Sequence, residues 1–222
     1  MSTGGRVPSL SRRKLLVAGA GGSALLLGAC SGGGGRPATA ARTRPLARGD
    51  LPRVAVAAAV DNLAVAMYQS MLARAGTGQY GTLPPATRAL WETARVHHAD
   101  HARHANLLLE GARAATVDVP DPALAPTVMS LVAAARGLSS LIDVALLVEE
   151  TAAATHQTNA ADLTGTSAVA FAASVSAVEA QHVAVWNLLN GRYPGSLNEA
   201  GTAVAFTSPD RNRPASDLPG SP

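Results

Sequence analysis

Several residue types are scarce in this chain, and their scarcity excludes several kinds of protein. Cys30 is the only cysteine, Lys14 is the only lysine, and aromatic residues make up 3% of the 222 residues. A single cysteine forms no intramolecular disulfide. Nucleic-acid binding is also not indicated, because no basic patch with interleaved aromatics is present to follow a phosphate backbone. Apolar residues make up 47% of the chain and are mainly Ala, Val and Leu, which predicts closely packed helices with an aliphatic core.

The formal charge of +3 comes from the N-terminus. The first 29 residues contain Arg6, Arg12, Arg13 and Lys14 and no acidic residue. Without them, 14 basic side chains stand against 15 acidic ones. The rest of the chain is therefore close to neutral.

The N-terminus has the layout of a cleaved export signal. A basic region precedes an apolar run over 15–29, and small residues precede Cys30. The run is shorter than the roughly 20 residues of a membrane span, so a permanent signal anchor is the weaker alternative. The stretch SRRKLL over 11–16 resembles a twin-arginine signal, and LGAC over 27–30 resembles the lipobox of bacterial lipoproteins, whose cysteine is lipidated. This resemblance implies an exported protein anchored to the outer face of the membrane, in the cell envelope; the alternative is a soluble secreted protein.

The composition divides the chain into four parts. After the signal over 1–29, residues 30–50 are rich in Gly, Pro and Arg and are predicted to form a flexible tether from Cys30. A helical domain is expected over 51–191. Residues 192–222 form a polar, Pro-rich tail.

Four helices are expected in the domain. Apolar spacing predicts helices over 52–75 and 85–115, then helical periodicity over 127–161 with a possible break at Gly137, and a last helix over 167–190 closed by Gly191. The first two and the last two are joined by short connections, whereas a longer passage with three prolines lies between the pairs. This is the pattern of an all-α antiparallel four-helix bundle made of two helical hairpins and a crossover.

The two predicted hairpins look like copies of one another. VDNLAVAMYQ in the first helix aligns without gaps to VEETAAATHQ in the third, which pairs Asp61 with Glu149 and Tyr68 with His156. HADHARHANLL in the second aligns to EAQHVAVWNLL in the fourth, which pairs His98 with Glu179 and His101 with His182. The matches coincide with polar residues that could form a site.

Those polar residues fall on the apolar stripes of the helices. In the second helix the stripe is predicted to contain Leu90, Ala94, His97, His101, His104 and Leu108, with His98 beside it. In the fourth it is predicted to contain Phe171, Val175, Val178, His182, Val185 and Leu189, with Glu179 one turn before His182. Buried carboxylates and imidazoles are costly unless they are paired or bind a metal, so a shared polar site is expected.

Bundle cores bind metals through one carboxylate from each of two helices and Glu-x-x-His from the other two. The chain resembles the ferritin-like superfamily over roughly 52–191, in particular exported bacterial ferritin-like domain proteins. The resemblance implies metal ligands on all four helices, which are Asp61, His98, His101, Glu149, Glu179 and His182. Iron, manganese or zinc suits such a mixture of imidazole and carboxylate.

The second helix departs from the motif of this superfamily. It has His98 where di-iron members commonly have a glutamate that bridges two metals. A neutral imidazole offers one lone pair and cannot replace that carboxylate, so the resemblance implies one ion or an unequal pair. Hydrogen bonding to Asp61 or Glu149 is the alternative role for His98.

Several further residues are expected around the predicted ligands. Tyr68 and His156 are expected to hydrogen-bond the site. Glu149 is preferred over Glu150 as the inward carboxylate, and Glu150 is expected to support the ligands from beside it. His97 and His104 are expected to be packing or partly exposed residues.

One hypothesis is a surface-anchored metal-binding protein that handles iron or oxidants. The other is a metal-free bundle that acts as a tethered structural or binding module. A homo-oligomer is compatible with the sequence. The sequence identifies neither a protein partner nor a substrate, and it leaves open whether the protein is an enzyme.

Overall fold

The computed structural model describes residues 46–190, so the predicted signal, Cys30 and the C-terminal tail lie outside the described residues. Five α-helices follow the short 3-10 helix η2 (Arg48–Asp50) within this range. They are α2 (Leu51–Gly76), α3 (Pro85–Gly111), α4 (Ala125–Ala134), α5 (Leu138–Asp162) and α6 (Thr166–Leu189).

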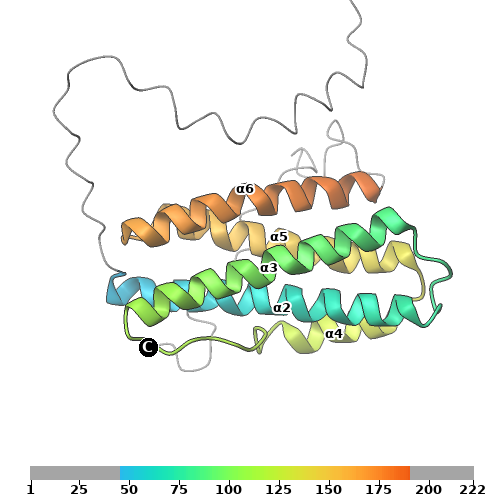
Figure 1. The fold of residues 1–222 in the computed structure, drawn as a ribbon, viewed down its shortest axis with the longest axis horizontal. Helices are drawn as coiled ribbons and strands as arrows, with labels where there is room; N and C mark the ends of the chain where they lie inside the picture. The colour runs from blue at the N-terminus through green and yellow to red at the C-terminus, as the bar shows by residue number, and fades with distance from the viewer. Residues whose placement is uncertain (1–45, 191–222) are drawn as a thin grey trace, which may run out of the picture. The chain divides into compact units, whose positions relative to one another are not determined.

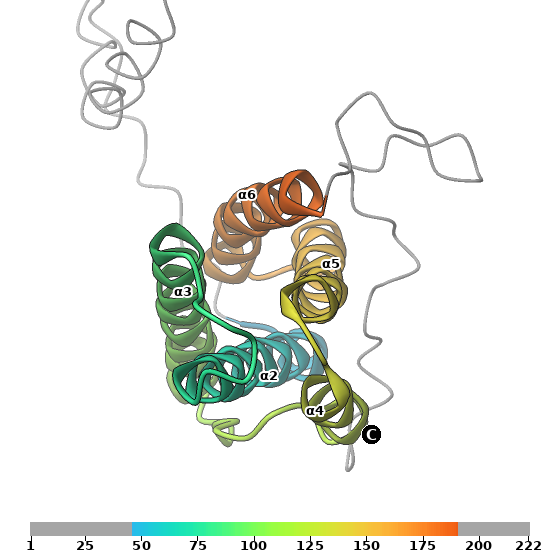
Figure 2. The same ribbon diagram turned by 90° about the vertical axis from the view of Figure 1, so that its right-hand side faces the viewer.

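The four long helices form an all-α antiparallel bundle, which confirms the predicted fold class (Figure 1). The end-on view in Figure 2 shows α2 beside α3 and α5 beside α6, with α3 next to α6 and α2 next to α5. The α2–α3 and α5–α6 pairs are the predicted hairpins. The interior enclosed by these four helices holds the polar residues of the predicted site.

The crossover between the hairpins contains an additional helix. The sequence predicts a possible break at Gly137, and the structure has two helices there, with α4 ending at Ala134 and Gly137 capping the N-terminus of α5. The crossover is fixed to the first hairpin by backbone and amide hydrogen bonds: Asn62 Nδ2 donates to the carbonyl of Val117 at 2.7 Å, and the N–H of Asp121 donates to the carbonyl of Ala59 at 3.0 Å. These bonds hold α4 against the outside of α2 and α5 (Figure 2).

Two predicted boundaries are corrected by the structure. The second helix ends at Gly111 instead of reaching 115, because Arg113 has a φ of 58°, in the left-handed region, and stops the helical turn. The predicted tether over 30–50 is also too long. Residues Arg48–Asp50 already form η2, and Asp50 is buried.

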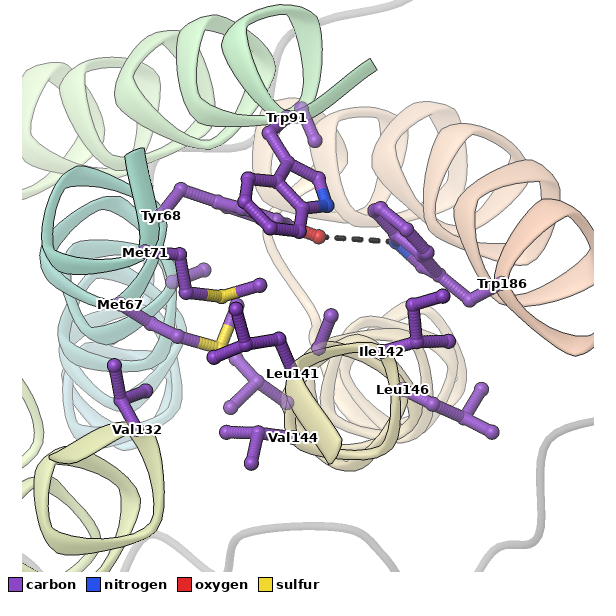
Figure 3. Packing of buried hydrophobic residues seen from close by; sticks show 14 of the residues in the cluster. Met67, Tyr68, Met71, Trp91, Val132, Leu141, Ile142, Val144, Leu146 and Trp186 are labelled. Carbon is purple, nitrogen blue, oxygen red and sulfur yellow. Dashed lines mark hydrogen bonds between the residues drawn. The ribbon is translucent and has the colours of Figure 1, made fainter. Parts of the chain in front are cut away.

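Large apolar side chains fill the bundle on one side of its polar centre. Figure 3 shows Tyr68 from α2 beside Trp91 from α3 and Trp186 from α6, with Met67 and Met71 of α2 pointing into the core toward Leu141 of α5. Leucine, isoleucine and valine side chains of α5 complete this cluster. A second cluster around Val54, Ala58, Leu109, Leu163 and Ala172 lies toward the other end. The polar residues are therefore enclosed between two apolar regions.

In α3 and α6 most of the buried positions lie one residue later in the sequence than the predicted stripes, so each helix is rotated about its axis relative to the prediction. In α3 the buried positions are Trp91, Ala94, His98, Ala102, Ala105 and Leu109, so His98 is central and His104 is exposed. In α6, Glu179 is central, and Val185 and Leu189 are exposed. Neighbouring faces of an alanine-rich helix are almost equally apolar. The burial of Trp91 and Trp186 and the pairing of the charged groups therefore decide the rotation of these helices.

Asp50 ties the start of the bundle to the α5–α6 turn. Its carboxylate accepts hydrogen bonds from the N–H of Gly165 at 2.8 Å and from the N–H of Thr164 at 3.1 Å. Burial by itself raises the pKa of Asp50, but the bonds from Gly165 and Thr164 outweigh it and lower the pKa. Asp50 thus satisfies backbone donors at the N-terminus of α6.

We expect Asp50→Ala to lower the free energy of unfolding by about 1–3 kcal/mol, because the buried N–H of Gly165 and the part-buried N–H of Thr164 lose their acceptor. Asp162→Ala is the matched control, since the Asp162–Arg53 ion pair is partly exposed. Its loss should cost less than about 1 kcal/mol. Urea denaturation followed by circular dichroism measures both. Equal effects of the two substitutions would contradict the anchoring role of Asp50.

Candidate metal centre

A cluster of seven polar side chains lies at the middle of the bundle, and every long helix contributes to it. Asp61 comes from α2, His98 and His101 from α3, Glu149 and His156 from α5, and Glu179 and His182 from α6. All are buried except His101, whose side chain is 12% exposed. The structure therefore brings together all six residues predicted as ligands.

His98 lies between two carboxylates. Its Nδ1 is 2.9 Å from Asp61 Oδ1, and its Nε2 is 3.2 Å from Glu149 Oε2. An imidazole whose two nitrogens both donate to carboxylates carries a positive charge. Burial by itself lowers the pKa of His98, but the negative charges of Glu179 and Glu149 outweigh it and raise the pKa well above the usual value. His98 therefore links the two halves of the cluster as a buried cation.

Glu179 makes the second link between the halves, with its two oxygens facing different histidines. Glu179 Oε1 is 2.8 Å from His101 Nδ1, and Glu179 Oε2 is 3.5 Å from His182 Nδ1. Both oxygens and His101 Nδ1 are buried without a partner in hydrogen-bond geometry. Close contact without an aligned hydrogen bond leaves lone pairs at the centre of the cluster available for a cation.

The internal repeat appears in the structure as a reciprocal pair of contacts. Tyr68 of α2 donates its hydroxyl proton to Glu149 Oε1 of α5. His156, the counterpart of Tyr68 in the repeat, lies on α5 with its Nε2 3.1 Å from Asp61 Oδ2 of α2. The cluster therefore has two related halves, one around Asp61 and one around Glu149.

The half around Glu149 continues into the aromatic region of the core. Trp186 Nε1 donates to the hydroxyl of Tyr68 at 3.0 Å (Figure 3), and the two rings are stacked with their centroids 6.2 Å apart. Burial and the adjacent Glu149 carboxylate raise the pKa of Tyr68 well above its usual value. Tyr68 thus stays protonated, and its O–H group donates a hydrogen bond to the Glu149 carboxylate.

The surrounding groups keep the carboxylates and imidazoles charged. Burial alone raises the pKa values of Asp61 and Glu149, but the nearby histidines, led by His156 for Asp61 and His98 for Glu149, lower both well below their usual values. For His101 and His182 burial lowers the pKa, but close contact with the carboxylates, Asp61 and Glu179 for His101 and Glu149 and Glu179 for His182, outweighs it and raises each pKa to about 9. Without metal, the cluster is a set of buried ion pairs.

His97 is a neighbour of the cluster that the sequence analysis does not include among the site residues. Its Nδ1 lies 3.0 Å from His182 Nε2, and the two rings are stacked with centroids 5.3 Å apart and an angle of 7°. Burial and the charge of His182 lower the pKa of His97. His97 Nδ1 is placed to accept a hydrogen bond from His182 and orient its ring. The sequence places His97 on the predicted stripe of the second helix, but nothing in it identifies His182 as its partner.

Glu150 and His104 lie away from the centre. Glu150 is half-buried on α5 and belongs to neither of the ligand groups that the cluster forms, whereas Glu149 is fully buried at its centre. His104 is exposed and stacks on Phe171 with the ring centroids 5.7 Å apart.

The donor set fits a transition metal ion. Two overlapping groups are present, Asp61–His98–His101–Glu179 and His98–Glu149–Glu179–His182, and the ligand atoms of each lie within 4.8 Å of one another. Metal bonds to these atoms are about 2.0–2.2 Å long, so ligands of one ion lie up to about 4.4 Å apart. Small side-chain movements would therefore close either group on an ion. Glu179, whose oxygens are unpartnered, and His98 belong to both groups.

The metal-free protein should lose stability as the pH rises. The pKa values of His101 and His182 are about 9 in the folded chain and about 6.5 when unfolded. Their contribution is therefore complete below about pH 6.5 and lost as the pH rises through about 9. We expect the melting temperature in a chelator to fall between about pH 6.5 and pH 10.

Circular dichroism melting curves of the full-length protein measure this effect. Few other groups of the bundle titrate in this range, because residues 46–190 contain no lysine and no cysteine. His104→Gln is the control and should keep the same pH dependence. A melting temperature that does not change with pH would show that the imidazoles are not held as cations.

Comparisons with known proteins identify the fold family. The family described as ferritin-like domain matches residues 49–192. No curated protein and no solved structure gives a significant match. Because the match covers more than half of the chain and includes all four helices of the bundle, the protein belongs to the ferritin-like domain family.

Proposed function

We propose that this protein binds a transition metal ion, or an unequal pair of ions, in the core of its bundle and handles iron or oxidants at the cell surface. The observation that carries the proposal is the position of Glu179, whose two buried oxygens lack hydrogen bonds, with Oε1 close to His101 and Oε2 close to His182. Iron, manganese and zinc suit these ligands. A bound iron or manganese ion would supply one-electron redox chemistry.

The chain's own residues would hold the ion and exclude water. Asp61 and His101 belong to one ligand group, Glu149 and His182 belong to the other, and Glu179 is common to both. Tyr68 orients Glu149 and His156 orients Asp61 through hydrogen bonds; we call Asp61 and Glu149 the two outer carboxylates. Such bonds strengthen metal sites by fixing the direction of the ligands.

His98 supports the choice of one ion or an unequal pair. Its two nitrogens face opposite carboxylates, and it carries a charge in the metal-free protein. A charged imidazole opposes a cation in either half, and binding through one nitrogen requires the loss of a proton from it. The two halves would therefore not be filled equally.

A metal-free structural module is the second candidate, and one observation favours it. The two outer carboxylates already have hydrogen-bond partners: Asp61 has two, and Glu149 has four. The cluster can therefore hold the helices in register without an ion. Elemental analysis of the purified protein distinguishes the two candidates: absence of stoichiometric metal, with melting unchanged by a chelator or by added metal, would support the structural module.

A pair of adjacent glutamates gives a sharp test of the metal site. We expect Glu149→Gln to weaken metal affinity by about tenfold or more, because the amide lacks the charge of a ligand carboxylate. Glu150→Gln changes the same chemical group one residue away and should leave the affinity unchanged. Isothermal titration with Zn²⁺ and with Mn²⁺ measures both. Equal losses, or no loss in Glu149→Gln, would rule out this ligand set.

We also propose that the protein is exported and anchored by a lipid on Cys30. The support is in the sequence: the arginine pair Arg12-Arg13, the apolar run over 15–29 and the small residues before the cysteine. A lipid on the mature N-terminus would attach the bundle to the outer face of the membrane through the segment after Cys30.

Replacement of the cysteine tests the anchor. We expect Cys30→Ser to move the protein from the membrane fraction to the soluble fraction of the cell envelope, because the residue that carries the lipid is lost. Fractionation and immunoblotting measure this. Ser31→Ala is the control and should leave the protein with the membrane. A Cys30→Ser protein that stays with the membrane would contradict lipid anchoring.

A further inference from the structure

The cluster is closed on most sides but approaches the surface between α3 and α6. Asp61, His98, Glu149, His156 and Glu179 have no exposed surface. Among the predicted ligands, only His101 and His182 are reached by solvent, with side chains 12% and 8% exposed. An ion or small molecule that reaches the centre must therefore pass one of these two histidines or move the helices apart.

A pocket of about 470 Å³ leads to His101. It lies between α3 and α6, with Asp100 and His104 on the α3 side and Phe171, Val175 and Val178 on the α6 side. Two further pockets, of about 370 and 410 Å³, are not lined by any residue of the cluster. At His182 the stacked ring of His97 covers the other approach. The pocket at His101 is thus the most direct approach among the described residues.

The size and charge of this pocket suit a hydrated divalent cation. About six waters of roughly 30 Å³ each occupy roughly 180 Å³, which the pocket accommodates. The exposed carboxylate of Asp100 supplies oxygen atoms and negative charge to the lining, and Arg103 Nη2, which lies 3.4 Å from Asp100 Oδ1, offsets part of that charge. Behind His101 lie the oxygens of Glu179, which are fully buried and lack hydrogen bonds. A cation therefore meets oxygen atoms at the surface and at the inner end, and His101 becomes a ligand when it gives up its proton.

Phe171 stands between the surface and the buried histidines. Its ring stacks on exposed His104 at a centroid distance of 5.7 Å and meets buried His156 edge to face at 5.8 Å. His156 Nδ1 is buried without a hydrogen-bond partner. The half-buried ring of Phe171 thus covers polar groups that would otherwise face the pocket.

We propose that the pocket between α3 and α6 is the access route of a divalent metal ion to the cluster, and that Phe171 controls its width. The inference rests on the proposed function, since it names the path to the same site. The ion passes Asp100 and His104, contacts His101 and then reaches Glu179. Phe171 itself is not a ligand, so it should affect the rate of loading and not the amount of metal bound.

Stopped-flow loading of the full-length, metal-free protein with Co²⁺ tests the route through the visible absorption of the bound ion. We expect Phe171→Ala to load faster by about tenfold, and Ser174→Trp, which places a large ring at the pocket wall, to load more slowly by about tenfold. Leu188→Ala is the control on the exposed face of the same helix and should load like the unchanged protein. The stoichiometry should be the same in all of them.

Modification of the metal-free protein with diethyl pyrocarbonate gives a readout that does not depend on metal. Modification of His101, measured residue by residue by mass spectrometry, should increase in Phe171→Ala and decrease in Ser174→Trp, while His97 outside the pocket stays unchanged. Unchanged labelling of His101 would overturn the role of Phe171. Normal Co²⁺ binding with equal loading rates in all variants would overturn the route but leave the metal site. No Co²⁺ binding in any protein would overturn the metal site and the route together.

Discussion

The burial of three carboxylates at the centre of the bundle is the constraint on which the rest of the structure depends. Asp61, Glu149 and Glu179 are fully buried, and isolated charges there would be strongly destabilising. Each helix of the bundle therefore has to supply either a carboxylate or an imidazole that faces one. His98 meets this need for Asp61 and Glu149 together, so its removal would leave two carboxylates without their shared partner. The large apolar side chains on either side keep water away and so strengthen these pairs.

The same pairs explain why a repeated hairpin produces a single site. The Tyr68–Glu149 and His156–Asp61 contacts each cross from one hairpin to the other. Neither hairpin can satisfy its own carboxylate by these bonds, so the polar groups fix how the hairpins pair. The repeat is imperfect at these positions, because Tyr68 donates from a hydroxyl whereas His156 uses a ring nitrogen. The two halves therefore have different chemistry in the same arrangement.

Much of the fold follows from the sequence, whereas the finer orientation does not. Proline and glycine positions and apolar spacing are enough to predict the bundle and the limits of most helices. The rotation of α3 and α6 is not predictable in this way, because alanine-rich stretches give nearly the same apolar contrast on neighbouring faces. As a result, the spacing predicts that His98 lies beside the stripe, whereas in the structure it is the central residue of α3. The separate helix α4 is missed because the sequence around Gly137 indicates a break without showing where the chain turns.

The candidate site is predictable to the extent that the internal repeat marks it. The alignment of His98 with Glu179 identifies two residues that, in the structure, each connect both halves of the cluster. The contact of His97 with His182 depends on how α3 faces α6, which no pattern within one helix records. That contact also has a consequence for the site: His182 directs Nδ1 to the carboxylates while Nε2 is occupied by His97. Only one nitrogen of His182 is then available to the centre, which fixes its direction before any ion binds.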